Sequence, residues 1–486
     1  MGQMRKGFLS TICILMLVGI LAACGGNSGG SSGGSTAGNT SKPAQTNNDA
    51  KDNTGNEDAK REQISISVYY PTPDREADRA LEDDKIRRYQ DVYPHVTIIK
   101  ADWQYNPSEI GIKMGANEAP TLFNTYATEG KFLAERGWAA DITDLWEAYL
   151  NKEQFNPILA NQFILDGKVY GIPQKGYVVG TVVNLKMLRD RGAAIPPINW
   201  TWDDLYNTAK AVSDPAAGIS GIALMGKGNE SGWNWTNFLF EAGGEIQNVA
   251  DGKVTATFNS EAGLQALAFY HKLRWEANAI PTDWALGWGD AVGSFAQGRT
   301  AMVVAGPDGP VDQGLNQGGM LKEDIAVYPM PAQHAGGKHT GVLGGDYLVI
   351  NPNASKAEQE AAFLYATFDY FSDEAIASAE ESIKARQAEG KFFIPPVIEY
   401  FKMDSAYGQK MKALYDKYEN VYQYDQDVLN LLDGKPEAQF NTQDFYGAMT
   451  NVVQEVFSNK DVDLKAALDK ASATVQETVF NTIKVD

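Results

Sequence analysis

The alternation of short β-rich runs with amphipathic helices, which begins at Ile64, is the feature that most restricts the fold. Ile64–Tyr70 predicts a strand, Glu76–Tyr89 a helix and Val96–Lys100 a second strand. Further strands are expected at Thr121–Asn124, Val178–Asn184, Gly221–Met225, Met302–Ala305, Ile325–Tyr328 and Tyr347–Ile350. Strands interleaved with helices of about 10–15 residues are typical of α/β proteins with largely parallel sheets. We therefore predict an α/β fold.

Two helix starts carry the sequence signature of a capping box. Thr201 is followed three positions later by Asp204, and Ser355 is followed at the same spacing by Glu358. In a capping box, each of the two side chains accepts a hydrogen bond from the backbone N–H of the other residue. We therefore expect one helix to begin just after Thr201 and another just after Ser355.

The first residues have the pattern of a secretory signal. Arg5 and Lys6 precede the apolar run Phe8–Ala23, which ends in small residues before Cys24. A short transmembrane anchor is the alternative, but the run falls short of the roughly 20 residues that span a bilayer. The sequence Leu-Ala-Ala-Cys resembles the lipobox of bacterial lipoproteins. That resemblance implies removal of residues 1–23, lipidation of Cys24 and attachment to the extracellular face of the bacterial cell membrane.

Residues 24–63 are expected to be a disordered tether that starts at the lipidated Cys24. The segment is rich in Gly, Ser and Asn and has no aromatic residue. Such a composition buries too little apolar surface to offset the loss of chain entropy on folding. Because the only other cysteine, Cys13, lies in the signal, no intramolecular disulfide is expected in the mature chain.

The acidic balance of the chain excludes two kinds of partner. The 486 residues include 62 acidic and 42 basic side chains, which gives a formal net charge of −20. A nucleic-acid-binding face needs clustered Lys and Arg, and so does a basic patch that docks on anionic lipid. We expect no nucleic-acid partner, and we expect any membrane association to use the lipid anchor.

Motifs of the common enzyme classes are missing. The sequence has no phosphate-binding loop of the G-x-x-x-x-G-K-[ST] type and no H-E-x-x-H, C-x-x-C or G-x-S-x-G. His334 and His339 share a Gly-rich loop, but a metal site would need two more ligands. Paired carboxylates of the glycosidase kind are paired in space and not in sequence, so this alternative stays open. We predict a protein that is not an enzyme and holds no cofactor or metal.

Six segments occur in an order that resembles one protein family. They are Ala119–Asn124, Gly137–Thr143, Asp166–Pro173 with the sequence DGKVYGIP, Trp200–Leu205, Phe295–Met302 followed by Gly306-Pro307, and Gly344–Tyr347. From about Ile64 to Asp486 the chain resembles the extracellular solute-binding proteins of ABC importers. The resemblance is to family 1, the carbohydrate-binding type that includes the maltose-binding protein.

The resemblance implies a two-lobed, periplasmic-binding-protein-like fold of the class II type, with a hinge and a ligand cleft between discontinuous lobes. The expected first lobe comprises residues 64–178 and about 340–375. The expected second lobe comprises residues 179–339 and about 376–486. We expect the chain to cross between lobes near 177–180 and again near 329–341.

A sugar site needs a flat aromatic platform beside hydrogen-bonding side chains, because a sugar ring presents C–H groups on its face and hydroxyls at its edge. Two tryptophan pairs lie among Gly, Asn and Asp residues, where we expect loops: Trp233 with Trp235, and Trp284 with Trp288. The resemblance places Trp233 at a stacking position. The candidate ligand-binding residues are Trp233, Tyr177, Trp288, Asp346, Trp235, Trp284, Asp308 and Asn124.

Three functions compete at this point. The leading hypothesis is a monomeric, lipid-anchored receptor that binds a sugar, in particular an oligosaccharide, and delivers it to the permease subunits of an ABC importer. Asp308 and Asn124 stand where maltose binders carry aromatic residues, which argues against maltodextrin as the ligand. A receptor of the same fold for a polyamine or peptide is the first alternative. A secreted glycan-degrading enzyme is the second.

Overall fold

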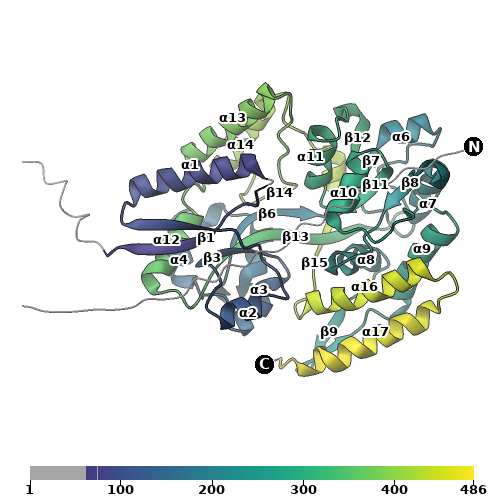
Figure 1. The fold of residues 1–486 in the computed structure, drawn as a ribbon, viewed down its shortest axis with the longest axis horizontal. Coiled ribbons are helices and arrows are strands. Elements are labelled where there is room, and N and C mark those ends of the chain that lie inside the picture. The colour runs from purple at the N-terminus through teal and green to yellow at the C-terminus, as the bar shows by residue number, and fades with distance from the viewer. Residues whose placement is uncertain (1–61, 74, 486) are drawn as a thin grey trace, which may run out of the picture. The chain divides into compact units, whose positions relative to one another are not determined.

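A computed structural model describes residues 62–73 and 75–485 (Figure 1). The predicted signal at residues 1–23, the lipidation site Cys24 and all but the last two residues of the predicted tether lie outside the described residues. Among the described helices, none combines the length and the apolar character that a membrane crossing requires. The described elements mix strands with helices throughout, which confirms the α/β prediction. The expectation of largely parallel sheets is wrong, because β13 and β7 run antiparallel to their neighbours in the two main sheets.

The first sheet has the strand order β14-β6-β13-β3-β1-β2, and β15 pairs with β13 beside this path. Its strands are β1 Ile64–Tyr69, β2 Val96–Ala101, β3 Leu122–Tyr126, β6 Ile172–Val178, β13 His339–Ile350, β14 Ile398–Glu399 and β15 Leu432–Pro436. β1 runs parallel to β2 and β3, whereas β13 runs antiparallel to β3 and β6.

The second sheet has the strand order β12-β7-β11-β8. Its strands are β7 Gly180–Asn184, β8 Ser220–Ala223, β11 Thr300–Ala305 and β12 Ile325–Pro329. β11 is parallel to β8 and antiparallel to β7. Two small hairpins accompany the sheets: β4 Ile164–Leu165 with β5 Lys168–Val169, and β9 Gln247–Ala250 with β10 Lys253–Ala256.

We call the first sheet and its helices the first lobe: α1 Glu76–Val92, α2 Ile110–Gly115, α3 Glu129–Glu135, α4 Thr143–Ala148, α5 Pro157–Ala160 and α12 Lys356–Ala366. The second lobe holds the second sheet with α6 Leu185–Asp190, α7 Trp202–Val212, α8 Asn229–Glu241, α9 Glu261–Trp275, α10 Trp288–Ala296, α11 Asp308–Asn316, α16 Thr442–Ser458 and α17 Leu464–Thr478. Three further helices are assigned to neither lobe: α13 Asp373–Ala388, α14 Ala406–Lys417 and α15 Gln426–Leu431.

The chain passes between the sheets inside both segments where we expected it to cross. β6 ends at Val178 in the first sheet, and β7 begins at Gly180 in the second. β12 ends at Pro329 in the second sheet, and β13 begins at His339 in the first. The two crossings lie side by side, because the Val179 backbone N–H donates to the Val342 carbonyl at 2.9 Å.

One part of the expected lobe division is wrong. Residues 376–486 were expected in the second lobe, but β14 pairs with β6, and β15 pairs with β13 in the first sheet. Phe371 and Tyr400 also pack against two hydrophobic cores, that of the first lobe and the smaller one beneath α13 and α14. α16 nevertheless packs against α8 of the second lobe, as Figure 1 shows in yellow. The rest of the expected division stays a prediction.

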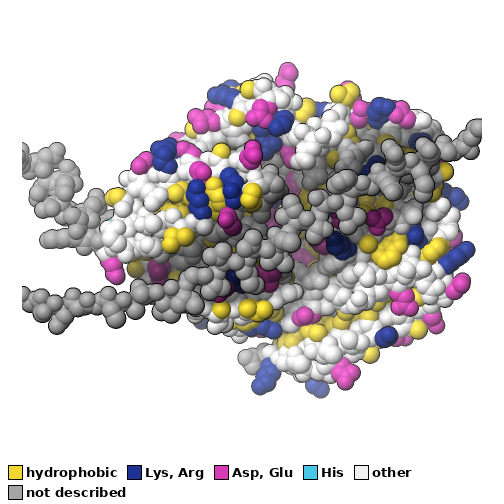
Figure 2. Space-filling view, in the orientation of Figure 1, with side chains coloured by type: hydrophobic (Ala, Val, Ile, Leu, Met, Phe, Trp, Pro, Cys, Tyr) yellow, Lys and Arg dark blue, Asp and Glu magenta, His cyan; other side chains and the backbone are white. Residues whose placement is uncertain are grey.

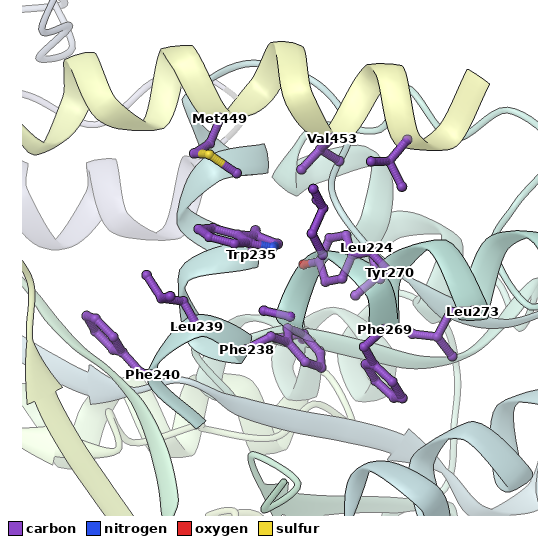
Figure 3. Packing of buried hydrophobic residues seen from close by; sticks show 14 of the residues in the cluster. Leu224, Trp235, Phe238, Leu239, Phe240, Phe269, Tyr270, Leu273, Met449 and Val453 are labelled. Carbon is purple, nitrogen blue, oxygen red and sulfur yellow. The ribbon is translucent and has the colours of Figure 1, made fainter. Parts of the chain in front are cut away.

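Each sheet has its own apolar core. In the first lobe Ile66, Val68 and Tyr89 are fully buried. In the second lobe the core lies between the sheet and the helices α8, α9 and α16. Figure 3 shows Trp235 of this core beneath Met449 of α16. Both predicted capping boxes, Thr201 with Asp204 and Ser355 with Glu358, are present.

The close packing of α8 on α16 generates a stability prediction. A Cβ atom on Gly232 of α8 would lie 2.5 Å from the Cα atom and the carbonyl oxygen of Tyr446 in α16. A Cβ on Gly293 of α10 would meet no atom within 4 Å. Gly232→Ala should therefore destabilise the protein by about 1–3 kcal/mol through overpacking against backbone. Gly293→Ala should stabilise it by up to about 1 kcal/mol, because alanine favours the helix.

The measurement is equilibrium unfolding in urea for both variants and the parent protein. Gly293→Ala controls for the helix propensity that both substitutions share. A Gly232→Ala variant at least as stable as the parent would contradict the contact between these helices.

Candidate ligand-binding site

Lys175 joins carboxylates from both lobes. Its Nζ atom lies 3.1 Å from Asp308 Oδ2 and 3.7 Å from Asp346 Oδ2. Lys175 and Asp346 are direct partners on the antiparallel strands β6 and β13, so both side chains leave the same face of the first sheet. Asp308 comes from the second lobe, where it is the first residue of α11. We call Lys175, Asp308 and Asp346 the Lys175 cluster.

The three side chains of the Lys175 cluster are partly buried by neighbouring protein atoms and partly exposed to solvent. The side chains of Lys175 and Asp346 keep 43% and 38% of their surface exposed, against 19% for Asp308. Burial nevertheless raises the pKa of Asp346, and the neighbouring Lys175 ammonium partly offsets that shift. The Asp308 carboxylate, followed by that of Asp346, raises the pKa of Lys175. Lys175 therefore carries its charge at neutral pH, and the three groups form a charged site that solvent can reach.

A row of cross-strand partners extends the cluster on the first sheet. Asp346 pairs with Lys175 on β6 and with Tyr126 on β3, which places all three side chains on one face. Tyr126 is 40% exposed. Asn124 lies two residues before Tyr126 on the same face of β3, and its Oδ1 atom is buried without a hydrogen-bond partner among the described residues. On the opposite face of β3, Phe123 and Thr125 are buried.

Aromatic rings from both lobes meet beside the row. Tyr177 follows Lys175 by two residues on β6, and its ring meets Trp233 of α8 edge to face at 6.3 Å. A Cβ atom on Gly344 would lie 2.4 Å from Tyr177 Cζ and Oη, so only glycine leaves room for this ring. Trp288, the first residue of α10, lies against Gly309, which follows Asp308. The structure thus brings Tyr177, Trp233 and Trp288 to the Lys175 cluster.

Two of the sequence candidates pack against residues of the second lobe. Trp233 and Trp235 are both in the helix α8, so the expectation of a loop is wrong. Positions two apart on a helix face different sides, and Trp235 is fully buried in the second core, where it packs near Phe445. Trp284 packs edge to face on Phe457 at 5.9 Å. We therefore exclude Trp235 from the site, and the role of Trp284 stays a prediction.

Several residues of the site were missed from the sequence. Lys175 itself was missed, and so were Tyr126, Tyr69 and Arg75. Arg75 donates through Nη1 to the Tyr69 hydroxyl at 3.2 Å and through Nε to Asp78 at 2.7 Å. The carboxylate of Asp346 contributes to the raised pKa values of Tyr69 and Tyr126, after burial as the main cause for each. The one sequence signal was a lysine inside an otherwise uncharged strand.

The lobes also touch on the side away from α11. Gln443 Nε2 of α16 donates to Thr128 Oγ1 at 3.1 Å, and Lys131 Nζ of α3 lies 4.4 Å above the ring of Phe440. A cavity of about 220 Å³ beside these contacts is lined from both lobes, by Glu129 and Phe132 among others on one side and by Asn229 and Asp444 on the other. The conformation described is therefore one in which the two lobes meet.

Two larger hollows lie away from the Lys175 cluster. One of about 710 Å³ is lined by Val178 and Leu343, which alternate with Tyr177 and Gly344 and so face the opposite side of β6 and β13. One of about 630 Å³ lies on the second lobe near Arg299. At the Lys175 cluster, the lobes meet through the contact of Lys175 with Asp308. Within the described residues, no three His, Cys, Asp or Glu side chains are arranged to hold a metal ion. On the face drawn in Figure 2, acidic and basic side chains are interspersed.

The comparisons with known proteins agree with this geometry. The model of the family described as bacterial extracellular solute-binding protein matches residues 78–375. A binding protein of Brucella abortus (strain 2308) is 23% identical over 347 residues, which cover 69% of this chain and 76% of that protein.

Solved structures match over most of the chain. An ABC transporter solute-binding protein from Thermotoga lettingae, bound with α-D-tagatose, is 20% identical with a TM-score of 0.67, over 85% of this chain and 99% of that one. An ABC substrate-binding protein from Listeria monocytogenes in complex with cycloalternan is 18% identical with a TM-score of 0.67, over 86% and 99%. These likenesses establish the two-lobed fold expected from the sequence.

The charge balance of the cluster predicts a pH dependence. In Lys175→Met, Asp308 and Asp346 lose their shared cation, so the pKa of Asp346 rises further above its value in the unfolded chain. A group whose pKa is higher in the folded than in the unfolded protein contributes stability that is lost as the pH rises through the folded-state pKa. Lys175→Met should therefore lower the free energy of unfolding, relative to the parent, by about 1 kcal/mol more at pH 7 than it does at pH 4. The difference is small because the charged groups are partly exposed.

Lys186→Met is the matched control, because Lys186 is an exposed lysine that pairs with Asp190 on the helix surface. Urea unfolding at the two pH values checks the prediction. An equal loss at both pH values, or the same pattern in Lys186→Met, would contradict it.

Proposed function

The chain belongs to the bacterial extracellular solute-binding protein family, and on that premise we propose that it captures a sugar between its lobes and delivers it to the permease subunits of an ABC importer. We propose an oligosaccharide as the ligand. Three similar proteins of this fold are named with a sugar or polyol, namely α-D-tagatose, cycloalternan and D-mannitol, and one is named with glycerophosphocholine.

The observation that carries this proposal is the meeting of aromatic rings and charged hydrogen-bonding groups at the Lys175 cluster. Trp233 and Tyr177 supply apolar ring surface, and Lys175, Asp308 and Asp346 supply donors and acceptors within reach of it. A sugar needs both, because its ring face is apolar and its edge carries hydroxyls. We assign Trp233, Tyr177, Trp288, Asp308, Asp346 and Asn124 as ligand contacts.

We propose that the ligand leaves chemically unchanged. Glycosidases use a pair of carboxyl groups, of which one is protonated as the general acid. Asp308 and Asp346 share a lysine, whose ammonium partly offsets the rise that burial causes in the pKa of Asp346. Because both carboxyl groups contact the same ammonium, we propose that they hold hydroxyl groups of the ligand.

Binding and release would follow from rotation of the lobes about three connections. Val179 and the segment 330–338 connect the sheets, and the segment 437–441 connects β15 of the first sheet to α16 of the second lobe. These segments would absorb the change in backbone angles. Because Lys175 and Asp308 belong to different lobes, the ligand contacts are complete only when the lobes meet. A permease that contacts both lobes could then distinguish loaded from empty receptor.

The proposed location follows from residues outside the described range. We propose that the signal at residues 1–23 is removed, that Cys24 is lipidated and that residues 24–63 tether the folded part to the extracellular face of the cell membrane. We further propose that the protein acts as a monomer, with the membrane reached through the lipid alone.

Ligand-induced stabilisation tests the proposal. The protein from Gln63 onward is unfolded thermally in the presence of neutral mono- and oligosaccharides, polyamines and short peptides. A ligand at about 100 times its Kd should add about 2.7 kcal/mol of stability. We expect one class of sugar to stabilise the protein and to be recovered intact. Stabilisation by a polyamine or peptide alone would overturn the sugar assignment, and cleavage of the sugar would overturn the receptor assignment.

The aromatic contact is tested by substitution. Trp233→Ala should weaken binding of the stabilising sugar by at least tenfold, because stacking on the ring face is lost. Trp275→Ala is the control, because Trp275 packs in α9 and donates through Nε1 to the Val456 carbonyl at 2.8 Å, on the far side of the second core. Calorimetric titration of the folded variants gives both affinities. Equal losses in the two variants would remove Trp233 from the site.

A further inference from the structure

We infer that the Lys175 cluster is a charge filter: the site accepts uncharged sugars and rejects sugars that carry a carboxylate or phosphate. The inference rests on the proposed function, because it names the class of sugar that the same site takes. The observation behind the inference is that Lys175, the cation at the centre of the site, already lies beside two carboxylates, those of Asp308 and Asp346.

The cations near the cluster are matched or outnumbered by acids. Lys175 has Asp308 and Asp346, and Arg75 has Asp78 at 2.7 Å. Together with their partners, Lys175 and Arg75 make three acids and two bases, so the field at the site is negative. The chain as a whole, at a formal charge of −20, adds to this field at long range.

Hydrogen bonding favours the same class of ligand. Lys175 Nζ donates one of its three N–H groups to Asp308, which leaves two donors for a ligand oxygen. Asp346, at 3.7 Å from Nζ, lies beyond hydrogen-bond distance, so its oxygens can accept from a ligand. A sugar hydroxyl both donates and accepts and therefore satisfies both groups. An ionised carboxylate or phosphate oxygen cannot donate, and beside Asp346 two acceptors would face each other.

Closure of the lobes would strengthen the discrimination. An anionic group could pair with Lys175 while the lobes are apart, because Lys175 belongs to the first lobe. Closure then brings Asp308 of the second lobe to the same ammonium, at 3.1 Å in the conformation described. A bound anion would repel this carboxylate, so the penalty falls on the closed state. An acidic sugar would therefore bind weakly and also fail to hold the lobes together.

The test compares three matched ligands by calorimetric titration. They are the neutral sugar that stabilises the protein, its uronate, in which the 6-hydroxyl carbon is oxidised to a carboxylate, and its 6-phosphate. We expect the parent protein to bind both acidic forms at least tenfold more weakly than the neutral sugar. In Asp308→Asn combined with Asp346→Asn, Lys175 becomes an unpaired ammonium, and the preference for the neutral form should fall by at least tenfold.

The control carries the same change of formal charge elsewhere in the second lobe. It combines Asp190→Asn with Asp469→Asn, since Asp190 pairs with Lys186 and Asp469 of α17 pairs with Lys465, both on the surface. This variant should keep the preference of the parent. Lys175→Met serves as a second probe, because loss of the central cation should increase the preference for the neutral sugar.

Three results would overturn the inference. One is equal affinity of the parent protein for neutral and acidic forms. Another is an equal change of preference in the control double variant, which would make net charge and not the cluster responsible. The third is a Lys175→Met variant that gains affinity for the acidic forms. If no sugar of any charge binds, the proposed function fails, and that outcome is distinct because no preference can then be measured.

Discussion

The pairing of β6 with β13 is the interaction on which the rest of the structure depends. Each strand continues into a segment that crosses to the second lobe, and the Val179–Val342 hydrogen bond of 2.9 Å joins the two crossings. A Cβ atom on Gly341 would lie 2.2 Å from the Val179 carbonyl oxygen, so this approach requires glycine. The same register that joins the lobes places Lys175 opposite Asp346 and Tyr177 opposite Gly344. Connection and site are therefore parts of one strand pair.

The position of Asp308 depends on α11 and on the segment that packs beside it. Asn316 of α11 exchanges hydrogen bonds with the backbone of Phe392, at 2.8 and 2.9 Å, and Arg386 pairs with Asp312. The same segment reaches the first lobe, where Asn156 donates to the Glu399 carbonyl at 3.2 Å. Residues 373–425 thus contact both lobes next to the crossings. Any rotation that moves Asp308 away from Lys175 must also shift one of these contacts.

Much of the fold could be predicted from local patterns, and the parts that could not be predicted depend on tertiary contacts. Both capping boxes and every predicted strand correspond to elements of the structure, because caps and hydrophobic runs act within a few residues. Trp233 and Trp235 were expected in a loop from their Gly and Asn neighbours. They lie in α8 instead, where Gly232 lets α16 approach, and packing outweighs propensity. Lys175 was missed for a related reason, since its partners come from β13 and α11 and strand register is not visible in one sequence.

The strength of the contact between Lys175 and Asp308 decides whether the site can report that a ligand is bound. Both side chains are partly exposed, and exposed ion pairs contribute about 0–1 kcal/mol. By itself, a contact of that size favours the meeting of the lobes only slightly. A sugar that adds hydrogen bonds to Lys175 and Asp346 in the first lobe and stacks on Trp233 in the second makes all of these contacts together only in the closed form. The equilibrium then shifts by the ligand's difference in affinity for the two forms and by nothing else. A stronger ion pair would close the empty protein as well, and occupancy would no longer determine its shape.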